Sequence, residues 1–181
     1  MDPEINYPYG IPFYSVENVT DRGFVDTKFI SKTDHKLLTQ KFKIEKGDIL
    51  MTRIGSIGDC KVIDWDVDAS FYVSLALLKI KKEFSSEFIF QYSKTNSFRI
   101  ELEKRSLLLA VPKKINLNDI SKIKICIPAK DEQESITEIL SDTDNMINNL
   151  ETLIEKKKNI KQGALRELLT GKRRLPGFDG D

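Results

Sequence analysis

Acidic residues followed two positions later by lysine, a spacing seen in metal-dependent nucleases, occur four times in this 181-residue chain. The four triplets begin at Asp26, Asp34, Asp59 and Glu155. Because 31% of the residues are charged, such triplets arise by chance, and none stands beside a second carboxylate at the end of a strand. We therefore interpret them as solvated surface. Metal-dependent cleavage that disappears in an Asp59→Ala variant would revive the nuclease hypothesis.

Other catalytic chemistry has little support. His35 is the only histidine and has no serine elbow near it, and Cys60 and Cys126 lie 66 positions apart. These three side chains are too few for a four-ligand zinc site or a disulfide framework. Gly55 and Gly58 lie between two strand-like runs, which is not the setting of a phosphate-binding loop. The sequence predicts a binding protein without a cofactor, in which the cysteines are small core residues and His35 is a loop residue.

Basic residues gather in four clusters within residues 1–130, which hold 21 Lys and Arg against 17 Asp and Glu. Lysine and arginine bind phosphates, and arginine also reads base edges. One such cluster is equally typical of a solvated face, but four of them favour DNA binding although the whole chain carries a net charge of only +1. The predicted DNA-binding residues are Lys28, Lys32, Lys36, Arg53, Lys94, Arg99, Lys113 and Lys114.

A mixed α+β body, residues 1–130, is expected to position these side chains. Pro12 places the first strand at an edge or at a strand start, and the run at 74–80 is apolar enough to be a central strand. A helix capped by Ser85 or Ser86 is expected to run to about Arg105. The predicted strands are residues 11–16, 48–54, 61–65, 71–73, 74–80 and 123–127, with a glycine-containing five-residue loop, 55–59, between the second and the third.

Residues 131–170 are predicted to form one long helix, because they contain no proline and only one glycine. Its apolar residues follow alternating steps of four and three, the spacing of a coiled-coil seam. A helix of this length spans about 60 Å and is too long to be covered by the body. Beyond its first two turns, we therefore expect the seam to pack against another helix. Gly171 ends the helix, and 171–181 form a C-terminal tail. The predicted seam comprises Ile136, Leu140, Thr143, Ile147, Leu150, Ile154 and, after a break in the rhythm, Ile160.

Four segments together resemble the specificity subunit of type I restriction-modification systems. Residues 10–20, Gly-Ile-Pro-Phe-Tyr-Ser-Val-Glu-Asn-Val-Thr, and 47–58, Gly-Asp-Ile-Leu-Met-Thr-Arg-Ile-Gly-Ser-Ile-Gly, resemble its target recognition domain. Residues 125–136, Ile-Cys-Ile-Pro-Ala-Lys-Asp-Glu-Gln-Glu-Ser-Ile, resemble the start of its conserved spacer helix. Residues 168–178, Leu-Leu-Thr-Gly-Lys-Arg-Arg-Leu-Pro-Gly-Phe, resemble the way such a subunit ends.

The resemblance implies a non-catalytic DNA specificity module that reads one half of a split site in double-stranded DNA. Its helix would recruit methyltransferase subunits, and through them the restriction subunit. S-adenosylmethionine, ATP and Mg²⁺ would then be bound by partner subunits. Family members usually carry two recognition domains and two paired helices, whereas this sequence has one of each. We therefore expect either a natural half-subunit that forms a homodimer through its helix or the C-terminal half of a longer subunit.

A structural adaptor, whose long helix mediates assembly without sequence-specific DNA binding, is the alternative hypothesis. Both hypotheses place the chain in the cytoplasm and away from a membrane. The acidic start Met1-Asp2-Pro3-Glu4 is not that of a signal peptide, and no apolar run reaches the roughly 18 residues of a membrane span.

Overall fold

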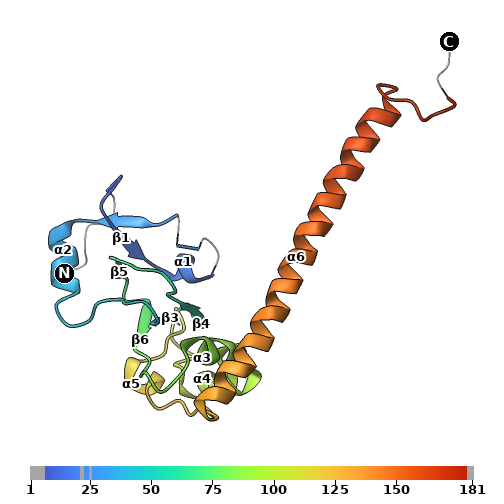
Figure 1. Cartoon of the computed structure of the whole chain (residues 1–181). Coiled ribbons are helices and arrows are strands. Elements are labelled where there is room, and N and C mark those ends of the chain that lie inside the picture. Colours follow the sequence, from blue (N-terminus) through green and yellow to red (C-terminus); the bar gives the residue numbers. More distant parts are fainter. Residues whose placement is uncertain (1–6, 21–22, 25, 179–181) are drawn as a thin grey trace. The chain divides into compact units, whose positions relative to one another are not determined.

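The computed structural model describes residues 7–20, 23–24 and 26–178 (Figure 1). The chain divides into two compact units, residues 1–137 and 138–181. The first unit combines two small sheets with short helices, and the second consists of most of one long helix and the tail that follows it. The predicted α+β fold class with a long C-terminal helix is confirmed.

The first sheet has the strand order β2-β1-β5, with β1 antiparallel to β2 and parallel to β5. Its central strand is therefore β1, although Pro12 could also have indicated an edge. Pro12 is tolerated because it is only the second residue of β1, and the pairing with β5 begins one residue later, at Phe13. The elements of this layer are β1 (Ile11–Tyr14), α1 (Val16–Thr20), β2 (Lys28–Ile30), α2 (Lys32–Leu38) and β5 (Ser70–Phe71).

The second sheet is fully antiparallel and has the order β4-β3-β6. The run that the sequence favoured as central, β6, lies at the edge, and β3 is central because it pairs on both sides. The expected five-residue loop is also wrong. Gly55 alone joins β3 to β4, and its φ of +84° permits that reversal without strain. The strands are β3 (Ile49–Ile54), β4 (Ser56–Val62) and β6 (Leu75–Leu78).

Two helices replace the single one expected between residues 85 and 105. Ser85 caps the first as predicted, accepting a hydrogen bond from the Phe88 backbone N–H. Thr95 caps the second in the same way through the Phe98 N–H, so the chain turns between them. Phe98 and Leu102 pack with Met51 in the core. The helices are α3 (Ser86–Ser93), α4 (Asn96–Arg105) and the short α5 (Leu117–Ile120).

Residues 123–127 have no regular secondary structure and do not form the predicted strand. The predicted alternation between buried and exposed side chains is present, because the isoleucines are half-buried against the core whereas Lys124 and Cys126 are exposed. Cys126 is therefore not a core residue. Cys60 is half-buried, and burial raises the pKa of its thiol to about 12.

His35 is a buried helical residue, and the expectation that it lies in a loop is wrong. Its Nδ1 lies 2.9 Å from Ser70 Oγ, and its Nε2 lies 3.3 Å from Asp68. These three residue types are those of a hydrolase triad, but Ser70 is only 2% exposed and cannot reach a substrate. The triad arrangement would also place the carboxylate on Nδ1. The cluster therefore ties α2 to β5, and a hydrogen bond with Lys43 lowers the pKa of Asp68.

The long helix α6 (Lys130–Leu169) contains 40 residues and starts within the first unit. Its anchor there is Gln133, which is 1% exposed. The side-chain Oε1 accepts a hydrogen bond from the Ser85 backbone N–H at 2.9 Å, and Nε2 donates to the Pro128 carbonyl at 2.9 Å. Gln133 therefore joins the start of α6 to the start of α3. Gly171, with a φ of +71°, follows the end of α6 as predicted.

Replacing Gln133 with leucine should destabilise the first unit by about 2 kcal/mol, because the partly buried Ser85 N–H and Pro128 carbonyl lose their hydrogen bonds to Gln133. Glu132→Leu is the matched control, since that side chain is exposed on the same turn. Urea denaturation of both variants measures the difference. Equal stability of the two variants would contradict the anchoring role of Gln133.

Candidate nucleic-acid interface

Two hollows adjoin each other where the β3–β4 hairpin meets α3 and α4. Their volumes are about 320 Å³ and about 530 Å³. Asp59 of β4 and Arg99 of α4 line both. Gly55 borders the first hollow and Gly58 the second, so the β3–β4 hairpin lines both hollows. We call the pair the hairpin hollows.

Three of the predicted DNA-binding residues meet in the hairpin hollows. Arg99 is shared, Lys113 lines the first hollow and Lys94 the second. These residues come from α4, from the segment after it, and from the end of α3. Lys94 lies 4.5 Å from the centre of the Phe90 ring, a cation–π distance, so its ammonium group is held beside the second hollow.

Hydroxyl groups and carboxylates share this surface with the cations. Ser56 donates a hydrogen bond to the Asp59 carboxylate, and the hydroxyl of the fully buried Thr52 lies 3.5 Å from that carboxylate. Glu103 also lines the first hollow. The hairpin hollows therefore offer both donors and acceptors, as base edges require, whereas a purely basic surface would bind phosphates alone.

Arg53 has a structural role that the sequence did not indicate. Its backbone N–H donates to Ser74, its carbonyl accepts from the Ile115 N–H, and its Nη1 lies 3.3 Å from the Ile115 carbonyl. The residue thus connects β3 to the segment before β6 and to residue 115. One guanidinium donor is already used inside the protein, which leaves the other N–H groups for a ligand.

The remaining predicted lysines lie on the first sheet and its helix. Lys28 is exposed on β2, and Lys32 and Lys36 are exposed on α2. Among the described residues that line the hairpin hollows, none of these three is present. Of the eight predicted residues, three line the hairpin hollows and three lie on the first sheet and its helix, whereas Arg53 of β3 and Lys114, which pairs with Ile54 of β3, line neither hollow.

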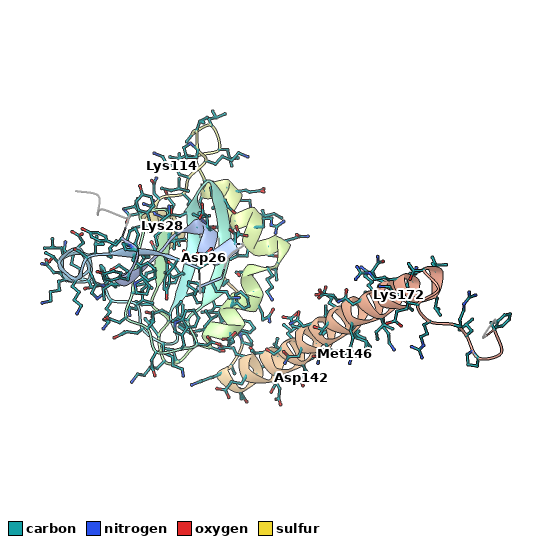
Figure 2. All side chains as sticks on the ribbon, turned by 90° about the horizontal axis from the view of Figure 1, so that it is seen from above. Asp26, Lys28, Lys114, Asp142, Met146 and Lys172 are labelled. Carbon is teal, nitrogen blue, oxygen red and sulfur yellow. The ribbon has the colours of Figure 1, made fainter. Side chains whose placement is uncertain are left out.

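An exposed apolar loop borders the hairpin hollows and was absent from the predicted site. This loop, residues 107–112, follows α4, and its Leu108 lines the first hollow together with Lys113. Lys114 lies beside it where it projects from the body (Figure 2). The signal in the sequence is the run Leu-Leu-Leu-Ala-Val before Pro112, which has no polar residue to mark a surface loop.

The predicted seam residues of α6 are mostly exposed. Ile136 is half-buried and packs with the core, as expected for the first turns only. From Leu140 onward the seam side chains are exposed, and so are the neighbouring apolar residues Ile139, Met146 and Leu153. Met146 lies midway along the helix in Figure 2. The exposed seam residues are Leu140, Ile147, Leu150, Ile154 and Ile160.

The described part of the chain contains neither a membrane-spanning helix nor a cluster of metal ligands. Across residues 7–20, 23–24 and 26–178, no helix has the length and apolar character needed to cross a membrane. Within those same ranges, histidine, cysteine, aspartate and glutamate form no group of three that could hold a metal ion.

The sequence matches the family described as type I restriction modification DNA specificity domain over residues 2–162. It is also 28% identical over 171 residues to a protein of Methanocaldococcus jannaschii described as the type I restriction enzyme MjaX specificity subunit. That alignment covers 89% of this chain and 39% of the relative.

Two solved structures share the fold. A chain from a study of complex assembly and conformational transition of the type I restriction-modification system has a TM-score of 0.63 and 18% identity, covering 87% of this chain and 38% of its own. The specificity subunit of the type I system from M. genitalium has a TM-score of 0.56 and 20% identity, covering 92% of this chain and 40% of its own. The chain therefore spans about two fifths of the length of these relatives.

Proposed function

The chain belongs to the type I restriction-modification DNA specificity family, and we propose that it reads one half of a split site in double-stranded DNA for a methyltransferase. The observation that carries this proposal is the family match over residues 2–162, which includes the body and most of α6. Body and helix correspond to the two tasks of such a module, which are to read a sequence and to hold an enzyme beside it.

DNA reading is assigned to the hairpin hollows and their surroundings. Lys113 and Lys114 would bind phosphates and fix the body on the duplex. Arg99 is the candidate for direct base contact, because it borders both hollows and a guanidinium can bind guanine through two hydrogen bonds. Lys28, Lys32 and Lys36, on the first sheet and its helix, would extend the phosphate contacts.

Enzyme recruitment is assigned to α6. Its exposed seam would pair with another helix, from a second recognition domain, from a second copy of this chain or from a methyltransferase subunit. Pairing of two copies would create a homodimer that reads a palindromic split site. In each arrangement a rigid helix would hold the methyltransferase where a target base can be flipped into its pocket.

The catalytic chemistry would belong to the partners. Methyltransferase subunits would bind S-adenosylmethionine, and the restriction subunit that they recruit would use ATP and Mg²⁺. The chain itself would contribute position and sequence preference in the cytoplasm, where these partners and the DNA are found.

Band-shift titration of the chain with its methyltransferase subunits, over a salt series, tests DNA reading. The expected result is a sequence preference together with an affinity that falls steeply with salt, because phosphate contacts release counterions. Methylome mapping of cells with and without the gene should return the split motif. An assembled complex without sequence preference would refute the proposal.

Charge reversal at Lys113 and Lys114 should weaken DNA binding for all sequences and lower the slope of log affinity against log salt by about 2, roughly one for each lost phosphate contact. Lys81→Glu with Lys82→Glu is the matched control, since it makes the same change at two exposed lysines outside the hairpin hollows. Band shifts at several salt concentrations provide both slopes. The adaptor hypothesis instead expects every measured activity of the Lys113→Glu, Lys114→Glu variant to stay unchanged.

A further inference from the structure

The apolar loop exposes large apolar side chains to solvent, although such side chains are normally covered in a stable protein. Leu109 is 100% exposed and Val111 is 99% exposed, and Leu107 and Leu108 are each about half exposed. Scattered apolar residues on a surface need no explanation, but four within five consecutive positions indicate an interaction site.

The base of the apolar loop is held firmly, so the tip is presented by a defined support. The Leu107 N–H donates to the Lys114 carbonyl at 2.7 Å, which closes the loop on itself. The Gly55 N–H donates to the Lys113 carbonyl at 2.8 Å, and Lys114 also pairs with Ile54 of β3. Ile115, directly after this base, is fully buried in the core. The loop is therefore fixed to the β3–β4 hairpin at the border of the hairpin hollows.

The charges around the apolar loop indicate what covers it. From Lys104 to Asn118 the chain contains four basic residues and no acidic one, and two carboxylates, Glu103 and Asp59, line the hollow beside the loop. Two of them, Lys113 and Lys114, directly follow the loop and are exposed. An apolar tip with cations at its base is complementary to a duplex, whose bases are apolar on their faces and whose phosphates lie on the outside.

We propose that the apolar loop is a wedge that inserts Leu109 and Val111 into the base stack of the bound DNA while Lys113 and Lys114 hold the flanking phosphates. This inference rests on the proposed DNA-reading function and adds its mode of contact. Apolar wedges of this kind partly unstack a base step and kink the duplex. The deformation depends on the sequence, so the loop would contribute to specificity without reading a base edge.

Duplexes labelled with 2-aminopurine test the wedge, because the fluorescence of this base rises when it is unstacked. The duplex would be one that the methyltransferase-bound chain enriches from a random pool, with the label placed at each purine in turn. The test variant is Leu109→Ser with Val111→Ser. The matched control is Leu37→Ser with Val73→Ser, the same changes at two exposed apolar residues on α2 and after β5.

Wild-type chain and control should brighten one label or two neighbouring labels, and the test variant should lose that signal. A base flipped by the methyltransferase should brighten its label with the wild type, the control and the test variant alike. Its signal can therefore be distinguished from that of the wedge. Affinity of the test variant should fall by about 100-fold or more, as expected when two apolar side chains no longer leave water. The salt slope should stay unchanged because no charge is removed.

Identical brightening in wild type and test variant would overturn the wedge and leave the DNA-reading function standing. A test variant that keeps its DNA affinity but no longer binds methyltransferase would overturn it too, because the loop would then contact protein. Wild-type chain that binds no duplex would refute both the wedge and the proposed function. Thermal unfolding of the test variant should match that of the wild type, since both replaced side chains are exposed.

Discussion

Replacing Leu150 and Ile154 with aspartate is expected to weaken the association of α6 with its partner helix by more than about 100-fold. Both side chains are exposed on the seam, so their burial can occur only in an assembly. Each would lose about 1.5–3 kcal/mol of burial free energy, and each aspartate would also bring a charge into an apolar interface. Co-purification with methyltransferase subunits and light-scattering mass measure the loss directly.

The matched control places the same two charges on the same turns but away from the seam. Asn148→Asp with Thr152→Asp adds two exposed aspartates to the opposite face of α6. This variant should keep the wild-type mass and methyltransferase binding, and cells that carry it should keep their methylation pattern. If the Leu150→Asp, Ile154→Asp variant also keeps its mass and its methyltransferase binding, the seam is not the assembly surface.

Gly58→Ala is expected to destabilise the first unit by roughly 2–5 kcal/mol. Gly58 has a φ of +96°, which costs an L-residue about 1–2 kcal/mol. A Cβ at this position would also lie 2.3 Å from Leu102 Cδ1. Leu102 also lines the first hollow, so its side chain can turn away from the new Cβ, but it then gives up contacts in the core, and this adds about 1–3 kcal/mol. Urea denaturation measures the change.

Gly55 supplies the control, because it has a similar φ of +84° and nothing within 4 Å of an added Cβ. Gly55→Ala should therefore show only the conformational part of the cost. The difference between the two alanine variants then measures the overlap with Leu102. In a Leu102→Ala background the two glycine substitutions should cost the same, whereas equal destabilisation by Gly55→Ala and Gly58→Ala in the wild-type background would show that α4 does not pack closely on the hairpin.

Features encoded by neighbouring residues could be predicted from the sequence. The hairpin follows from two β-rich runs around Gly55, and the long helix follows from a repeated spacing of apolar residues without proline. Ser85 could be recognised as a cap for the same reason, because its partner N–H is only three residues away. Each of these features depends on contacts within a few residues or on a periodic pattern.

Features that depend on distant contacts could not be predicted. The central position of β1 results from pairing between Phe13 and Ser70, and neither residue indicates the other. The helix of His35 begins at a local cap, Ser31, but the burial of His35 depends on Ser70 and Asp68, which lie beside it. The break at Thr95 is local but has no glycine or proline to mark it, so one amphipathic helix is the simpler prediction.

The candidate site was predictable by residue type and not by location. Lys94, Arg99 and Lys113 come from three segments, and only the packing of α4 against the hairpin brings them to adjoining hollows. The apolar loop was overlooked because a run of leucines before a proline is more often part of a buried segment. The chain passes through the core at Ile115, immediately after the loop, and the loop itself remains outside.

The tied base of the apolar loop has an evolutionary consequence. The backbone bonds at Leu107, Lys113 and Lys114 involve no side chains, so they persist whatever residues occupy the tip. Mutation, insertion or recombination between these ties changes the tip and leaves the core untouched. The tip can therefore vary in sequence and in length while the core that carries it stays the same.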